Sequence, residues 1–132
     1  MENIIKLISM IFTLIATMIT WIFGSWNISI IVLISFMALD YITGILKAYI
    51  TKNLSSSIGV KGITKKGLIL IILIVGSLLD RLTNSNEWIF RTLICYFYIS
   101  NEGLSLLENC AALGLPLPDK LLSSLKQLQE NK

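Results

Sequence analysis

The segment FMALDYITGILKAY, residues 36–49, places a carboxylate, Asp40, inside an otherwise apolar stretch. The preceding 33 residues, from Leu7 to Leu39, carry no charge. A helix rises about 1.5 Å per residue and the hydrocarbon core of a bilayer is about 30 Å thick, so one crossing needs about 20 residues. The uncharged stretch is too long for one crossing and too short for two. A second crossing that begins near Trp26 therefore has to include Asp40.

The composition favours a membrane protein over a soluble one. Of the 132 residues, 55% are hydrophobic and 14% are charged, and the mean hydropathy is +0.77. Soluble domains carry about a quarter charged residues, and this length suits a single domain. The net charge of +3 gives only a weak hint of nucleic-acid binding. The basic residues flank apolar segments and form no face with aromatic side chains for base stacking, so we expect no nucleic-acid partner.

Residues with catalytic or metal-binding potential are sparse. The chain has no histidine and only two cysteines, Cys95 and Cys110, which are too isolated for a metal-ligand motif. We interpret both as reduced packing residues. The sequence also lacks a paired nucleophile and base, and it has no glycine-rich phosphate loop. We therefore expect no enzymatic activity, no cofactor and no metal.

The pattern predicts an all-α polytopic membrane protein with four transmembrane helices, or three if the first lies outside the bilayer. The expected spans are about 5–23, 27–47, 67–82 and 88–107. The turn residues GSWN separate the first two. No A-x-A-like site follows the first span, which favours a retained helix over a cleaved signal peptide.

Two polar segments complete the expected single domain. Residues 51–66, TKNLSSSIGVKGITKK, are predicted to form a cytoplasmic loop. The double-proline segment LGLPLP ends the membrane part, and residues 116–132 are predicted to contain a short amphipathic helix. Its apolar face, expected to lie on the membrane or on a partner, comprises Leu121, Leu122, Leu125 and Leu128.

The distribution of basic residues predicts the orientation. In the four-span arrangement, nine of the eleven fall on one side and only Arg81 and Arg91 fall on the other. Because cytoplasmic loops carry the excess of lysine and arginine, we expect both termini in the cytoplasm.

Ionisable residues within the spans sort by depth. Asp40 and Glu102 fall toward the cytoplasmic end, whereas Asp80 and Arg91 fall near the outer end as a candidate ion pair. A central Asp costs about 2.5–3.5 kcal/mol on insertion scales, so such groups face protein or water rather than lipid.

The helical period groups polar residues on one face of each span. The polar face of the first span is explained by packing within a four-helix bundle. The acidic residues in the later spans instead favour a water-lined path or a polar subunit interface. The faces are Ser9, Thr13, Thr17, Thr20 and Gly24 in the first span; Asp40, Thr43, Gly44 and Lys47 in the second; and Arg91, Cys95, Tyr98, Glu102, Ser105 and Asn109 in the fourth.

Several of these residues, in this order and spacing, resemble the toxin secretion/phage lysis holin family, which includes clostridial toxin-release holins. The resemblance covers about residues 36–125. It rests on Asp40, Thr43 and Gly44; on Ser55, Ser56, Gly59 and Gly62; on Asp80; and on Glu102, Ser105, Glu108, Asn109, Gly114, Pro116 and Pro118.

The resemblance implies a small protein of the bacterial cytoplasmic membrane that assembles into homo-oligomers and opens lesions. An endolysin or a large protein toxin would then cross the membrane through these lesions. Two other functions stay open on the sequence: a small four-span proton-coupled exporter, in which Asp40 alternates between substrate and proton, and an antiholin that binds and blocks a holin.

Overall fold

The computed structural model describes residues 1–84 and 86–130, and in these ranges the chain is all-α, as predicted. The elements are α1 (Glu2–Phe23), α2 (Ile28–Ile50), α3 (Ser56–Leu82), α4 (Ile89–Ala112) and α5 (Asp119–Glu130).

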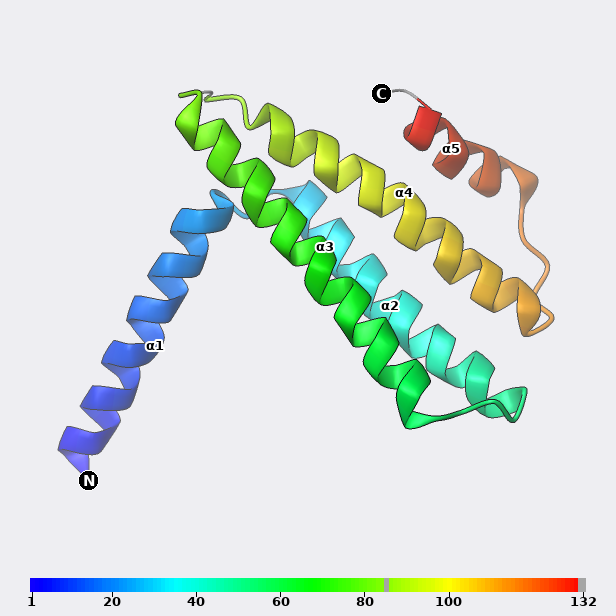
Figure 1. Ribbon diagram of the computed structural model, residues 1–132, viewed down its shortest axis with the longest axis horizontal. Coiled ribbons are helices and arrows are strands. Elements are labelled where there is room, and N and C mark those ends of the chain that lie inside the picture. Colours follow the sequence, from blue (N-terminus) through cyan, green and yellow to red (C-terminus); the bar gives the residue numbers. More distant parts are fainter. Residues whose placement is uncertain (85, 131–132) are drawn as a thin grey trace.

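Helices α2, α3 and α4 lie side by side and enclose the apolar core (Figure 1). A glycine, Gly76, lets α3 approach α4 closely, because a Cβ at this position would meet the side chain of Ile94. Small residues at helix contacts serve this purpose in membrane bundles. The buried core side chains are Ile30, Leu33 and Met37 from α2, Ile69 and Leu73 from α3, and Cys95 and Ile99 from α4.

Helix α1 diverges from this bundle in Figure 1, and none of its residues is buried. The hydroxyls of Ser9, Thr13 and Thr17 donate hydrogen bonds to carbonyl oxygens of their own helix at 2.9, 2.8 and 2.8 Å. The prediction that the polar face of the first span packs inside the bundle is therefore wrong for Ser9, Thr13, Thr17 and Thr20, whereas Gly24, just after α1, is buried next to Trp88 and Arg91. A hydroxyl in a helix can be satisfied one turn earlier without any partner helix, so the hydroxyl residues of this face did not require a packed neighbour.

Three helices are long and apolar enough to cross a membrane: α1 with 22 residues, α2 with 23 and α3 with 27. Such helices are typical of a membrane protein. Helix α4 has 24 residues but carries Arg91, Glu102 and Glu108, and it is not among these three. A crossing by α4 stays a prediction.

The predicted loop at residues 51–66 is mostly helical. Helix α3 begins at Ser56, so only five residues, 51–55, separate it from α2. The hydroxyl of Ser55 accepts a hydrogen bond from the backbone N–H of Ile58 at 3.3 Å and caps the helix. The prediction was wrong because hydropathy marks where the apolar residues begin and not where the helix begins. Residues 56–66 are helical although their two glycines are poor helix formers, and both glycines lie against Tyr41 of α2.

The amphipathic C-terminal helix is present as α5, but it packs against α4 of its own chain (Figure 1). Among the side chains of α5 that the structure describes, that of Leu125 is buried, at 8% exposure. This differs from the expected contact with the membrane surface or a separate partner, because α4 offers a glycine, Gly103, at the point of contact. The predicted role of the Leu128 side chain, and residues 131–132, lie outside the described part of the chain.

Candidate functional site

A lysine from α3 joins two carboxylates from α2 and α4. The ammonium of Lys66 donates a hydrogen bond to Asp40 Oδ2 at 2.7 Å and a second one to the carboxylate of Glu102. The three residues are thus brought together from the three helices that form the core. We call Asp40, Lys66 and Glu102 the charge network.

An asparagine and two hydroxyls extend the network along α2 and α4. The side-chain amide of Asn109 donates to Asp40 Oδ1 at 3.1 Å, to the backbone oxygen of Asp40 at 3.3 Å and to the hydroxyl of Thr43 at 3.1 Å. The Ser105 side chain also interacts with the Asp40 carboxylate. These contacts hold the carboxylate of Asp40 in one orientation and join α2 to α4 independently of Lys66.

The charge network is sheltered but reachable from one side. The Glu102 side chain is 2% exposed, whereas those of Asp40 and Lys66 are each 13% exposed. A pocket of about 190 Å³ opens beside the network, lined also by Tyr41, Gly62 and Lys65. Water or a polar group of another chain could therefore reach Asp40 and Lys66 without unfolding the bundle.

The balance of charge makes this site sensitive to its surroundings. The network holds one cation and two carboxylates, so with all three ionised it keeps one negative charge. Taking an ion pair out of water gains little over apolar packing, but losing one partner leaves an uncompensated buried charge. A network of this kind specifies one arrangement of the helices and penalises a rearrangement that separates its members without offering them water or other polar partners.

The motif residues between α2 and α3 have structural roles near this site. Ser55 caps α3, and Ser56 is its first residue. Two glycines one turn apart then let α3 approach α2: a Cβ at Gly59 would lie 3.4 Å from the Tyr41 hydroxyl, and one at Gly62 would lie 3.2 Å from the Tyr41 ring. This close approach positions the following turn of α3, which carries Lys66.

At the opposite end of the bundle, the expected ion pair of Asp80 with Arg91 is not formed among the described residues. The Asp80 carboxylate accepts hydrogen bonds from the backbone N–H groups of Phe90 at 2.9 Å and Arg91 at 2.8 Å. It therefore caps the N-terminus of α4, where Trp88 provides no side-chain cap. The free N–H groups of the first helical turn and the helix dipole attract the carboxylate.

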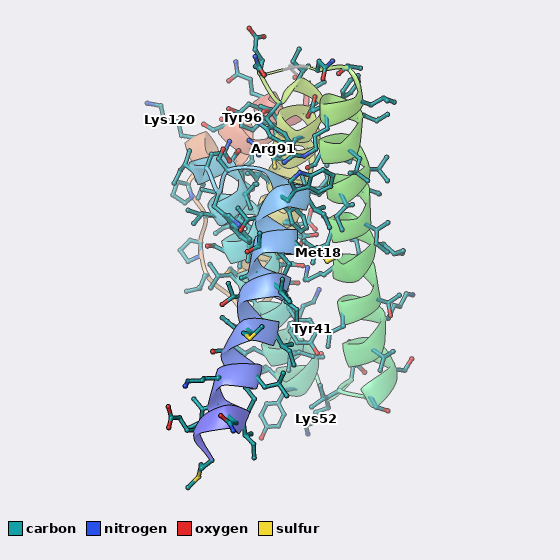
Figure 2. The ribbon with its side chains drawn as sticks, turned by 90° about the vertical axis from the view of Figure 1, so that its left-hand side faces the viewer. Met18, Tyr41, Lys52, Arg91, Tyr96 and Lys120 are labelled. Atoms are coloured by element: carbon teal, nitrogen blue, oxygen red, sulfur yellow. The ribbon has the colours of Figure 1, made fainter. Side chains whose placement is uncertain are left out.

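The guanidinium of Arg91 instead holds the junction of α1 and α2. It donates to the carbonyl oxygens of Phe23 at 2.6 Å and Ser25 at 3.2 Å and lies 4.3 Å from the centre of the Trp88 ring. Figure 2, viewed from the side of α1, shows Arg91 near this junction and Lys52 at the opposite end of the bundle. The positive charge of Arg91 lies at the C-terminus of α1, where it interacts favourably with the negative end of the helix dipole.

The predicted site residues divide into three groups. Asp40, Thr43, Glu102, Ser105 and Asn109 come together around the charge network, and Gly44 lines the adjoining pocket. Asp80 and Arg91 form a separate capping site. Lys47 lies half-buried in the last turn of α2 and Glu108 is exposed; in the described residues neither contributes an ion pair to the network.

Lys66 is the member of the network that sequence reasoning missed. It was assigned to the 51–66 loop, although it directly precedes the apolar segment that begins at Gly67. A lysine at that boundary, on the same helix as the apolar segment, can reach an acid within the membrane. The position of Lys66 next to the apolar segment could therefore have indicated that it belongs to the site.

The chain is similar to one protein family and to several bacterial and phage proteins. The model of the bacteriophage holin family matches residues 17–130. An uncharacterized 14.9 kDa protein in the nagH 3' region of Clostridium perfringens is 56% identical over 132 residues, all of both chains. A probable holin of Bacillus phage phi105 is 34% identical over 94 residues, 70% of this chain and 68% of that protein. The uncharacterized protein YqxH of Bacillus subtilis is 34% identical over 95 residues, 71% of this chain and 66% of that protein. No solved structure matches the chain.

Proposed function

This chain belongs to the bacteriophage holin family, and from that premise we propose that it acts as a holin. It accumulates in the bacterial cytoplasmic membrane, assembles into homo-oligomers and opens lesions. An endolysin, which lyses the host, or a large protein toxin then crosses the membrane through these lesions. The observation that supports the proposal, beyond family membership, is the charge network between α2, α3 and α4.

The charge network suits a protein that has to change its contacts inside a membrane. A bundle stabilised only by apolar packing would gain nothing by exposing its helices to water. The network of Asp40, Lys66 and Glu102 places three ionisable groups beside an open pocket. When neighbouring copies or water can solvate these groups, the cost of separating the helices falls, because the desolvation penalty of each ion is relieved.

The proposed orientation has both termini in the cytoplasm. In the four-span arrangement, nine of the eleven basic residues fall on that side, which supports this orientation. If α1 and α2 both cross the membrane, the N-terminus and the connection between α2 and α3 lie on the same side. In Figure 1 both of these lie away from the α1–α2 junction, as this arrangement requires. A reporter fused after residue 132 and a tag between Thr51 and Ser55 should both be cytoplasmic. Protease access to that tag from outside the cell would contradict the arrangement.

Regulated expression in a bacterium tests the proposed function. We expect growth to continue normally and then stop abruptly, with loss of membrane potential at the same moment, because lesions open once enough copies have assembled. Co-expression of an endolysin without its own export signal should then lyse the culture at that time. A protein that leaves the potential intact but delays lysis by another holin would be an antiholin. Tolerance to toxic cations without loss of potential would indicate an exporter.

A further inference from the structure

Two open cavities meet at Arg81, at the end of the bundle opposite the charge network. The first is a groove of about 800 Å³ between α1 and the last turn of α3. The second, of about 200 Å³, lies beside the turn between α3 and α4. The side chains of Arg81 and Trp88 line both cavities and so form the boundary between them. Figure 1 shows α1 and α3 diverging from this end of the molecule.

The two cavities differ in chemistry. The groove is walled along α1 by apolar side chains, among them Phe12, Ala16 and Trp21. The smaller cavity is lined by the side-chain amides of Asn84 and Asn86, which can donate and accept hydrogen bonds. No residue of α1 is buried, so the chain itself leaves the groove open. A groove of this kind inside a membrane is filled by hydrocarbon chains or by another protein segment.

The charge of Arg81 is not neutralised within the described part of the chain. Its guanidinium donates a hydrogen bond to the backbone oxygen of Trp21 and lies 4.5 and 5.1 Å from the centres of the Trp21 and Trp88 rings. Its Nε has no hydrogen-bond partner there, and none of the ion pairs involves it. Asp80 also lines the smaller cavity, but its two carboxylate oxygens accept hydrogen bonds from the backbone of α4. Arginine held on aromatic faces with its charge unmatched is suited to bind phosphate.

The position of the site along the helices agrees with the surface of a membrane. Arg81 follows Lys66 in α3 by 15 residues, and Trp21 follows Lys6 in α1 by the same number. Each interval corresponds to roughly 22 Å of helix and is mostly apolar, so the site lies near the membrane surface opposite these lysines. Tryptophan is enriched at that level. The three tryptophans of the chain lie in this region: Trp21, Trp26 and Trp88.

We propose that Arg81 binds the phosphate of an anionic phospholipid whose acyl chains lie in the groove between α1 and α3. The rest of the headgroup extends toward the cavity of Asn84 and Asn86. Phosphatidylglycerol fits this site, because its headgroup offers hydroxyls to the amides and carries no ammonium group that Arg81 would repel. The lipid then fills the angle between α1 and the bundle. The inference requires that α1 and α3 cross a membrane, but it does not require that the chain opens lesions.

Tryptophan fluorescence tests the preference for this lipid. The Trp26→Phe protein, in which Trp21 and Trp88 are the remaining emitters, is reconstituted in vesicles of phosphatidylcholine and phosphatidylglycerol. Bromine is placed on the acyl chains of one lipid or of the other, and quenching is measured across mole fractions. We expect a binding constant several-fold higher for phosphatidylglycerol than for phosphatidylcholine, because Arg81 retains the anionic lipid. Equal binding constants would overturn the inference.

Substitutions at Arg81 separate the site from general attraction to the protein surface. Arg81→Gln should bring the ratio of the binding constants close to one, whereas Arg81→Lys should keep part of the preference. Lys61→Gln is the matched control, because Lys61 is an exposed cation at the other end of α3, and it should leave the ratio unchanged. A preference that survives in Arg81→Gln, or one that is lost equally in Arg81→Lys, would show that Arg81 does not bind the phosphate.

Two further readouts identify the occupant of the groove. Excess inorganic phosphate, compared with sodium chloride at the same ionic strength, should not relieve quenching by brominated phosphatidylglycerol, because the acyl chains hold the lipid in place. Relief by phosphate would mean a simple anion site. Weak quenching by both brominated lipids would mean that protein, such as a second copy of this chain, fills the groove. Either result would overturn the inference.

Release of a trapped dye from the same vesicles separates this inference from the proposed function. Vesicles that show the preference for phosphatidylglycerol but never release dye at any protein density would retain the lipid site and contradict the holin function. Vesicles that release dye without any preference between the two lipids would retain the holin function and contradict the lipid site.

Discussion

Replacing Lys66 with methionine should destabilise the folded bundle strongly. The substitution keeps an unbranched apolar stem out to the ε position and removes the charged amino group with its hydrogen-bond donors. Asp40 and Glu102 then face each other without the cation that joins them. Both carboxylates are at most 13% exposed, so water replaces the lost partner only in part.

The expected magnitude follows from that burial. Removing one partner of a buried ion pair costs about 3–5 kcal/mol. Asp40 keeps its hydrogen bonds from Asn109, and the pocket beside it admits water. We therefore expect the lower part of that range, about 3 kcal/mol, which corresponds to more than a hundredfold change in the unfolding equilibrium constant.

Unfolding in mixed detergent micelles, followed by circular dichroism, measures this free energy. Lys65→Met is the matched control, because Lys65 is the exposed neighbour of Lys66 on the same helix, lies outside the charge network and should change stability little. A triple variant with Lys66→Met, Asp40→Asn and Glu102→Gln should regain most of the loss, since it leaves no unpaired charge. Equal stability of the Lys66→Met and Lys65→Met proteins would refute the reasoning.

Three further changes test other parts of the structure. The Asp40→Asn protein should insert normally but shift the time at which the membrane potential collapses. Asp40→Leu should shift that time further, because the amide of Asn109 loses a side-chain acceptor at a cost of about 1–3 kcal/mol. Wild-type timing of both variants at matched membrane levels would show that Asp40 is only a packing residue. Asp80→Ala should lower stability in micelles by about 1–2 kcal/mol, because α4 loses its capping carboxylate; unchanged unfolding would contradict the capping role. Gly62→Ala should lower the thermal midpoint because its Cβ would crowd the tyrosine ring at 3.2 Å, whereas Gly67→Ala, with nothing within 4 Å, should not; equal midpoints would argue against a close contact of α2 and α3.

The part of the site that the sequence predicted follows from helix geometry. The length of the uncharged stretch placed Asp40 inside a membrane helix, and the 3.6-residue period put Glu102 and Asn109 on one face of another. Both arguments depend only on spacing within a single helix. The structure brings these two faces together, as the depth of the two acids along their helices had indicated.

The parts that were missed depend on contacts between segments. Lys66 was assigned to a loop because hydropathy marks the boundary of the apolar residues and not that of the helix. Asp80 was paired with Arg91 by charge, but backbone N–H groups at the start of α4 compete for the same carboxylate. The docking of α5 depends on a glycine, Gly103, that leaves room for Leu125. None of these choices is encoded in the periodicity of one segment.

Release of two trapped markers from vesicles that contain the purified protein tests the central claim most directly. A small dye and a folded fluorescent protein are enclosed together, and the density of this chain in the membrane is raised in steps. The account predicts that both markers are retained at low density and lost together above a threshold, because lesions require assembly and admit folded proteins. Loss of the dye alone at all densities, or retention of both at the highest density, would contradict it.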